Sequence, residues 1–194
     1  MKLYLTPGAC SLADHIALTE AGIEVETIKV DLSTRRTEHD EDYTAVNPKG
    51  YVPALVFDDG EVLTENVAIM DWVASQAPHL APDGRLGRSR NIEMLAFLAT
   101  EIHRPFMRSM FSPADAEKQA AREAIVGRLA LINQRLKDDF LFGDAFSTAD
   151  ALFYVMVRWA RDSGLKIPDN LIAYAERVEA RPAVQRALCA EGLA

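Results

Sequence analysis

The spacing of apolar residues changes along the chain, from a mixture of strand and helix periods to a helix period alone. Over the first 77 residues it predicts strands at 2–5, 25–30, 54–57 and 61–63 and helices at 10–21 and 65–76. In the first helix Leu12, Ile16 and Leu18 share one face, and Gly22 is placed to end it. The polar segment 31–47 predicts a loop with at most a short irregular helix.

A break in this pattern begins at residue 78. Residues 78–87 contain two prolines and two glycines, a composition typical of an interdomain linker. Beyond it the periodicity predicts helices at 86–110, 114–137, 148–162, 170–179 and 183–190. Ser147, with Asp150 three residues later, predicts a capping box. We therefore expect an α/β domain at 1–77, a linker at 78–87 and an all-helical domain at 88–194.

Composition and charge exclude several classes of protein. Of the 194 residues 49% are hydrophobic and 26% charged, which is typical of a soluble globular protein. The net charge of −8, with no basic stripe, argues against a nucleic-acid partner. Cys10 and Cys189 are too few for a disulfide framework, and the histidines show no metal-ligand spacing. With no apolar run long enough for a membrane span and no signal-peptide pattern, we expect a cytoplasmic protein without a metal or a membrane partner.

Three short motifs in the N-terminal part stand at fixed places in the predicted elements. Residues 6–11 (TPGACS) follow the first strand, residues 47–55 (NPKGYVPAL) precede the hairpin, and residues 63–69 (LTENVAI) open the second helix. Their order and spacing resemble the glutathione transferases, and a cysteine at position 10 resembles the bacterial beta class. Residues 146–150 (FSTAD) resemble the family's capping motif, so the resemblance covers the whole chain. It implies a thioredoxin-like domain that binds glutathione, followed by an all-helical domain that holds the second substrate.

Cys10 is the first candidate for chemistry. It precedes a predicted helix, where free amide groups and the helix dipole stabilise an anion and favour a thiolate. That anion is either Cys10 itself or the thiolate of bound glutathione, and a buried structural cysteine is the alternative. The neighbouring Ser11 has a hydroxyl that could donate to a thiolate, although serine at a helix start is more often a capping group.

The resemblance implies two groups of glutathione-binding residues. Val52 and Pro53 match the family's Val-Pro pair, in which the proline peptide is cis and the valine main chain pairs with the cysteinyl backbone of glutathione. Glu65 and Asn66 match the pair that binds the ammonium and carboxylate of the γ-glutamyl group. Asn66 departs from the family pattern, because serine is more usual there.

Three further residues follow from the same resemblance. Arg35 stands where the beta class places a lysine for the glycyl carboxylate, with Lys49 as a weaker candidate. His103 matches a histidine that points into the active site and could donate to a thiolate or move a proton. Ala96 replaces an asparagine that in the family often reaches the partner subunit's glutathione, so an intersubunit contact is missing or supplied otherwise.

The second substrate is expected to be apolar. Seven residues are candidates to line its pocket, with core packing as the alternative for most: Tyr4, Phe106, Met107, Met110, Phe111, Phe153 and Trp159. Nothing in this set identifies a particular electrophile. Cys189, on the last predicted helix, is expected to have no role.

The function that these expectations favour is conjugation of the glutathione thiolate to hydrophobic electrophiles, a detoxifying activity, in a homodimer. Glutathione is then the co-substrate, with no metal. Two alternatives stay open. In the first, Cys10 forms a mixed disulfide with glutathione and reduces disulfides or peroxides, although residues 10–13 lack a second cysteine to resolve it. In the second, the protein carries glutathione conjugates or apolar ligands without turnover.

Overall fold

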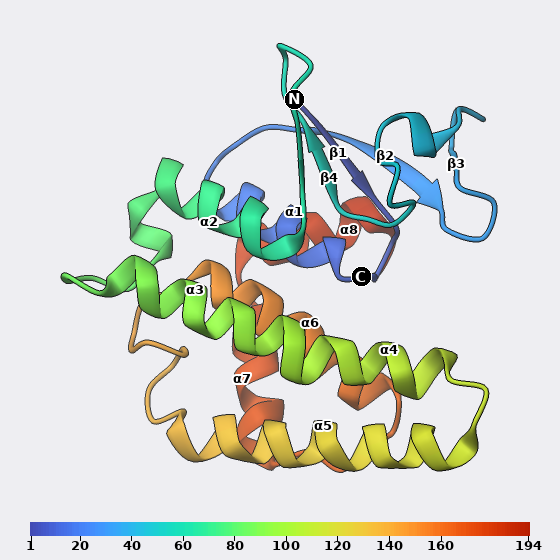
Figure 1. Cartoon of the computed structure of the whole chain (residues 1–194). Coiled ribbons are helices and arrows are strands. Elements are labelled where there is room, and N and C mark those ends of the chain that lie inside the picture. The colour runs from blue at the N-terminus through green and yellow to red at the C-terminus, as the bar shows by residue number, and fades with distance from the viewer.

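The computed structural model describes all 194 residues. The first part is a five-stranded sheet with two helices on one side (Figure 1). Its elements are β1 (Lys2–Leu5), α1 (Ser11–Glu20), β2 (Glu26–Asp31), β3 (Arg36–Thr37), β4 (Ala54–Val56), β5 (Val62–Thr64) and α2 (Asn66–Gln76). The strand order is β3-β2-β1-β4-β5, with β1 parallel to β2 and antiparallel to β4. The carboxyl end of β1 therefore leads directly into the turn before α1.

The rest of the chain is helical and returns to the first part at its end (Figure 1). The elements are α3 (Gly87–Leu98), α4 (Arg104–Phe111), α5 (Asp115–Arg135), α6 (Thr148–Asp162), α7 (Asp169–Glu179) and α8 (Pro182–Glu191). Short 3-10 turns lie at Tyr43–Ala45 and Pro78–Leu80. No helix combines the length and the apolar character needed to cross a membrane.

Two differences from the sequence expectations matter for the site. The helix predicted at 86–110 is interrupted by a π-helical turn at Ala99–His103, which carries the candidate His103. Such turns insert a residue into the α-helical ladder without altering the apolar periodicity enough to be read from sequence. The segment 31–47 contains the expected short helix and also β3, whose two residues are too short to give a strand pattern.

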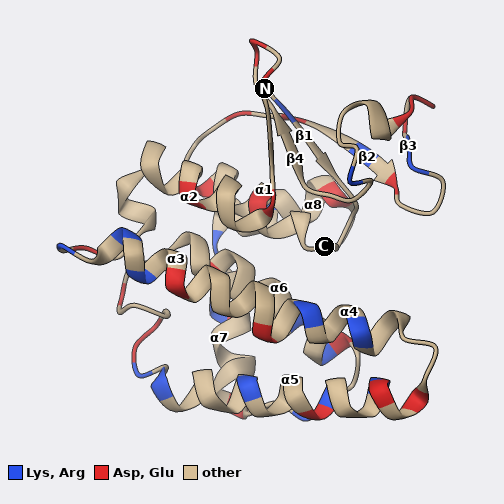
Figure 2. Ribbon diagram, viewed as in Figure 1, with Lys and Arg blue, Asp and Glu red and all other residues tan.

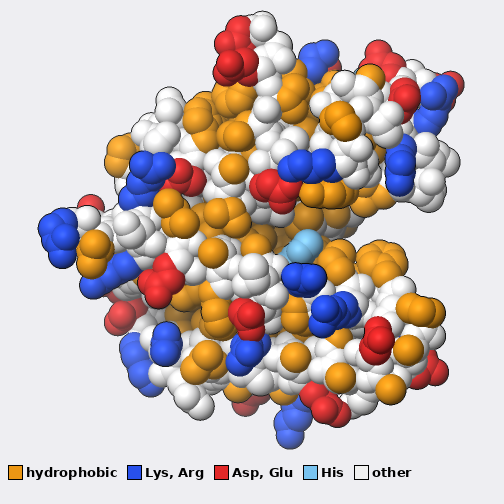
Figure 3. Space-filling view, in the orientation of Figure 1, with side chains coloured by type: hydrophobic (Ala, Val, Ile, Leu, Met, Phe, Trp, Pro, Cys, Tyr) orange, Lys and Arg blue, Asp and Glu red, His pale blue; other side chains and the backbone are white.

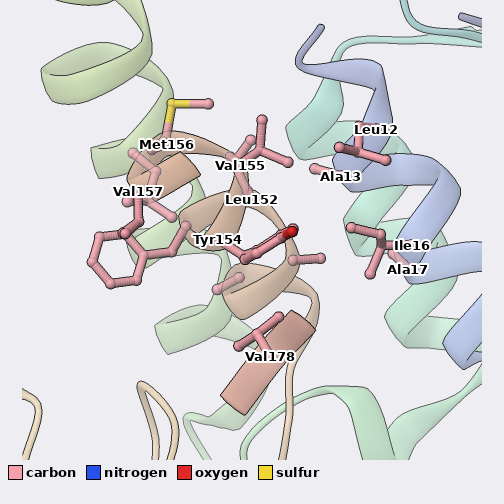
Figure 4. Close-up of a cluster of buried hydrophobic side chains, with 14 of the residues drawn as sticks. Leu12, Ala13, Ile16, Ala17, Leu152, Tyr154, Val155, Met156, Val157 and Val178 are labelled. Atoms are coloured by element: carbon pink, nitrogen blue, oxygen red, sulfur yellow. The ribbon is translucent and has the colours of Figure 1, made fainter. Parts of the chain in front are cut away.

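A single apolar core joins the sheet part to the helical part. The 39 residues of this cluster come from both, and α1 packs against α2, α6 and α8. Figure 4 shows Leu12 and Ile16 of α1 facing Leu152 and Val155 of α6. Each such side chain contributes about 1.5–3 kcal/mol when fully buried. Since the core is continuous, the domain boundaries at residues 77 and 88 stay a prediction.

The capping box at the start of α6 is confirmed. The Ser147 hydroxyl accepts from the Asp150 amide at 3.3 Å, and the Asp150 carboxylate accepts from the Ser147 amide at 2.9 Å. The other Asp150 oxygen accepts from the Leu141 amide at 2.9 Å and from the Tyr174 hydroxyl at 3.0 Å. The burial of Asp150 raises its pKa, and these donors offset the penalty. The box therefore fixes the start of α6, the helix that contributes Trp159 to the site.

Candidate active site

A cavity of about 900 Å³ lies between the two parts of the chain, and several of the predicted site residues line it. The space-filling view shows the hollow at the right of the molecule, between the upper sheet part and the lower helices (Figure 3). The sheet part contributes Pro7, Gly8, Ala9, Cys10, Leu32, Tyr51, Val52 and Glu65; the helices contribute His103, Arg104, Met107, Met110, Phe111 and Trp159. Four of the predicted site residues thus meet here: Cys10, Val52, Glu65 and His103.

Cys10 stands at the N-cap of α1 and is 9% exposed. Its thiol donates to the Val52 carbonyl at 3.6 Å. Burial, together with the nearby Asp14 carboxyl, raises the pKa of Cys10 to about 12, although the amides of Cys10 and Ser11 and the Asn66 side chain act in the opposite direction. The thiol is therefore neutral at pH 7, which argues against the expectation that Cys10 supplies its own thiolate. The amides at this helix start remain able to stabilise the thiolate of a ligand.

Side chains from α6 and α8 of the second part bind the turn before α1. Gly8, with a φ of +71°, donates its amide to the Glu191 carboxylate at 2.9 Å, and its carbonyl accepts from the Trp159 indole at 2.8 Å. The other Glu191 oxygen lies 2.9 Å from the Nδ1 atom of His15 on α1. Sequence reasoning had no signal for this arrangement, because its residues lie up to 183 positions apart.

Ser11 does not reach the cavity. Its fully buried hydroxyl accepts from the Thr6 amide at 3.2 Å and donates to the Thr6 carbonyl at 3.4 Å. The hydroxyl closes the turn between β1 and α1 and caps no amide of the helix. The expected catalytic hydroxyl therefore gains no support from the geometry, whereas the Ser11 amide faces the Cys10 thiol.

The main chain at Val52 is open to a ligand. The Val52–Pro53 peptide is cis, as the resemblance implied. The Val52 amide has no acceptor within the chain, and its carbonyl meets only the Cys10 thiol. Both groups belong to a residue that lines the cavity. Because backbone groups are rarely left unpaired, this edge is suited to pair with the main chain of a peptide-like ligand.

Glu65 presents an ionised carboxylate at the cavity. It has a φ of +78° just before α2. Its carboxylate accepts from the Lys49 ammonium and, at 3.0 Å, from the Tyr51 hydroxyl. The Lys49 hydrogen bond is the main cause of the lowered pKa of Glu65. The Lys49 ammonium is therefore paired with Glu65 in this structure and is not free to bind the glycyl carboxylate of glutathione.

The Asn66 side chain points inward rather than into the cavity. Its amide nitrogen donates to the Cys10 carbonyl at 3.1 Å and to the Asp14 carboxyl at 2.6 Å. Asp14 is fully buried, its other oxygen has no partner, and burial raises its pKa well above the ordinary value. The Asn66 side-chain amide therefore does not face the cavity in this structure, and its role toward a ligand carboxylate stays a prediction. The asparagine instead ties the start of α2 to the start of α1.

Arg35 also lies outside the cavity. It is exposed on the loop after β2, with a φ of +57°. Its guanidinium packs on Gly50, where a Cβ atom would lie 3.1 Å from the Arg35 Nε atom. Its role toward the glycyl carboxylate stays a prediction.

His103 is placed by the π-helical turn. Its ring lies 5.6 Å from the Trp159 ring, with an interplanar angle of 35°. Burial lowers the pKa of His103, and the Glu65 charge opposes this only in part. The imidazole is therefore neutral at pH 7 and able either to accept a proton or to donate a hydrogen bond. Ala96, one helix segment earlier, is exposed and outside the cavity.

The expected apolar pocket is confirmed in part. Met107, Met110, Phe111 and Trp159 line the cavity. Tyr4, Phe106 and Phe153 are buried in the cores instead. Leu32, Tyr51 and Arg104 also line the cavity and were not predicted, because only the folded chain brings their segments to the same opening. No group of three or more His, Cys, Asp or Glu side chains is arranged to hold a metal ion.

The chain matches two family profiles in succession. Residues 9–76 match the glutathione S-transferase N-terminal domain, and residues 95–182 match the glutathione S-transferase C-terminal domain. The chain is 43% identical over 201 residues to glutathione S-transferase GstA of Escherichia coli O157:H7, with complete coverage of both.

Two solved structures are similar over their whole lengths. A bacterial beta-class glutathione S-transferase of Sphingomonas chungbukensis is 46% identical with a TM-score of 0.92, and both chains are covered completely. A sphingomonad glutathione S-transferase complexed with glutathione is 47% identical, also with a TM-score of 0.92 and complete coverage of both chains.

The inward position of Asn66 predicts a structural penalty for its removal. We expect Asn66→Ala to lower the free energy of unfolding by about 1–3 kcal/mol, because the buried Asp14 carboxyl and the Cys10 carbonyl lose their shared donor. Urea denaturation of both proteins measures this difference. Asn170→Ala, at an exposed asparagine whose side chain bonds only Asn133, is the matched control and should stay within about 0.5 kcal/mol of the parent. Equal stability of all three proteins would show that the contact is energetically unimportant.

Proposed function

The chain belongs to the glutathione S-transferase family, and we propose that it is a glutathione transferase whose cavity between the sheet and the helices joins glutathione to an apolar electrophile. One observation carries this proposal. The main chain of Val52, whose amide has no acceptor within the chain, the ionised Glu65 and the start of α1 at Cys10 open into the same cavity. These three features match the backbone, the ammonium and the thiol of one glutathione molecule.

The recognition of glutathione follows from the chemistry of these groups. The cysteinyl main chain pairs with the amide and carbonyl of Val52, as an added short strand. The γ-glutamyl ammonium binds the Glu65 carboxylate, and the γ-glutamyl carboxylate faces the first-turn amides of α2. Arg35 is proposed for the glycyl carboxylate, which requires its guanidinium to leave its contact with Gly50.

The reaction needs a glutathione thiolate close to the start of α1. The amides of Cys10 and Ser11 stabilise this anion, and each unit by which they depress the pKa of the thiol corresponds to about 1.4 kcal/mol. The neutral His103 accepts the thiol proton or donates to the thiolate. The sulfur then forms a bond to the electrophilic carbon, and the leaving group departs with its electron pair.

The two alternatives are not favoured. A redox cycle through Cys10 needs its thiolate, yet burial and Asp14 raise the pKa of this thiol, and residues 10–13 contain no second cysteine to resolve a mixed disulfide. Non-catalytic carriage would make no use of the neutral His103 beside the cavity. The similar proteins named above are called transferases.

The glutathione site is tested first by calorimetry. We expect Glu65→Ala to weaken glutathione binding about 10- to 100-fold, because the ammonium loses its charged acceptor. Glu61→Ala, at an exposed residue of the hairpin before β5, should bind glutathione like the parent. Absence of binding by the folded parent at millimolar glutathione would contradict the proposed function.

Cys10→Ala separates conjugation from thiol chemistry. We expect the variant to keep its rate of conjugation with 1-chloro-2,4-dinitrobenzene within about tenfold of the parent, because the main-chain amides remain. Any reduction of a mixed disulfide with glutathione should disappear. Loss of conjugation beyond a hundredfold, with glutathione binding intact, would instead assign the essential chemistry to Cys10.

A homodimer is the proposed assembly. An apolar groove formed by Phe57, Val62, Leu63 and Trp72 lies open on the sheet part, and Val62 is 44% exposed. We expect sedimentation equilibrium to give a dimer at micromolar concentration, and Val62→Asp to shift it toward monomer. A monomeric parent would contradict the proposed dimer.

We also propose a cytoplasmic location, which the two free cysteines support and cell fractionation would test.

A further inference from the structure

The cavity gathers much of the exposed apolar surface of the chain. Seven large hydrophobic residues are exposed, and four of them line this cavity: Leu32, Tyr51, Met110 and Phe111. Phe111 is the extreme case at 76% exposure. Met110, Phe111 and the Trp159 ring form an apolar wall on the helical part, and Leu32 and Tyr51 line the cavity from the sheet part. Such a concentration marks a site whose ligand covers apolar surface.

One cation in the cavity has no partner. Arg104 lines it and makes no ion pair or hydrogen bond through its side chain. The carboxylates nearby are engaged elsewhere: Glu65 binds Lys49, and Glu101 on the π-helical turn binds Arg128. The helix α4 itself carries two arginines and no acidic residue, visible as its blue positions in Figure 2. Arg104 is therefore available for an anion.

The arginine and the apolar wall lie along the same face of α4. Arg104, Met107 and Phe111 are spaced at i, i+3 and i+7, and all three line the cavity. At 1.5 Å per residue, Arg104 and Phe111 lie about 10 Å apart along the helix. His103, beside Arg104, marks the end at which the thiolate reacts. A ligand on this face meets a guanidinium near the reacting end and apolar side chains further out.

We propose that the second substrate is an aromatic electrophile that carries a carboxylate or a similar anionic group, bound by Arg104. This inference rests on the proposed glutathione transferase function and narrows its substrate class. A guanidinium gives two parallel hydrogen bonds to a planar carboxylate, which adds orientation as well as attraction. The apolar wall then holds the ring, and the carboxylate fixes which ring carbon faces the thiolate.

A matched pair of aryl chlorides tests this preference. In 4-chloro-3-nitrobenzoate the glutathione sulfur bonds to the carbon that carries chlorine, the carbon–chlorine bond breaks, and chloride leaves with the electron pair. The thiol proton passes to His103 and then to solvent. The amide, 4-chloro-3-nitrobenzamide, undergoes the same reaction with a neutral group of similar shape. The kcat/KM of each compound is divided by its uncatalysed rate constant with glutathione at the same pH, which removes the difference in intrinsic reactivity.

The variants isolate the guanidinium. We expect Arg104→Gln to lower the carboxylate-to-amide ratio of these corrected values about tenfold, as expected for one charge-assisted contact at a partly open site. Arg104→Lys keeps the charge and should retain part of the preference. Arg108→Gln is the matched control, because Arg108 lies one turn away on α4 and does not line the cavity. It should leave the ratio unchanged.

An unchanged carboxylate-to-amide ratio in Arg104→Gln would overturn the inference while the transferase function stands. If the KM for glutathione also rises with both compounds, the result would assign Arg104 to glutathione instead.

A binding measurement separates these outcomes from failure of the proposed function. The unreactive 4-methyl-3-nitrobenzoate is titrated into the parent and into Arg104→Gln, in the presence of glutathione. Weaker binding to the variant supports the anion site even if neither aryl chloride reacts, whereas equal binding, or no binding to the parent, overturns it.

Discussion

The packing of α1 is the constraint on which the rest of the structure depends. Residues 11–18 are all buried, because the helix is enclosed by the sheet, by α2 and by α6 and α8. A helix enclosed on every side cannot shift without opening several apolar contacts, so its N-terminus is fixed in space. Cys10 lies at that N-terminus, next to the cis peptide of Val52–Pro53 and directly after the turn that joins β1 to α1. The packing of α1 therefore fixes the Cys10 end of the cavity and, through α6, the position of Trp159.

This enclosure brings polar groups into the interior, and the chain pairs most of them with partners distant in sequence, although one Asp14 oxygen has none. Glu191 of α8 binds the Gly8 amide and His15, and Asn66 of α2 binds Asp14. A buried polar network of this kind tolerates few alternatives, since each unpaired member costs about 1–3 kcal/mol. The result is an active-site turn that is held rigidly from the far end of the chain. The residues that position the site therefore also stabilise the fold, and the Asn66 side chain does so by binding Asp14 and the Cys10 carbonyl.

The sequence predicted what depends on local pattern and missed what depends on orientation. Apolar periodicity placed the main helices and most strands, and a four-residue motif located the capping box at Ser147, because these features are encoded within a few turns of chain. The π-helical turn under His103 could not be predicted, since one inserted residue hardly alters the periodicity. Nor could motifs show that the side chains of Ser11 and Asn66 point away from the cavity, because either direction is compatible with a helix start. Arg104 carried no motif at all.

The electrostatics of the cavity explain why a free arginine matters in a chain with a net charge of −8. In the proposed reaction main-chain amides, rather than a cationic side chain, stabilise the thiolate, and burial lowers the pKa of His103. The Lys49 charge is already neutralised by Glu65. A second anion placed beside the thiolate would therefore meet repulsion without compensation, except at Arg104. The amides at the helix start carry no net charge and stabilise the thiolate whichever substrate is bound. Discrimination between substrates by charge therefore depends on the unpaired guanidinium of Arg104.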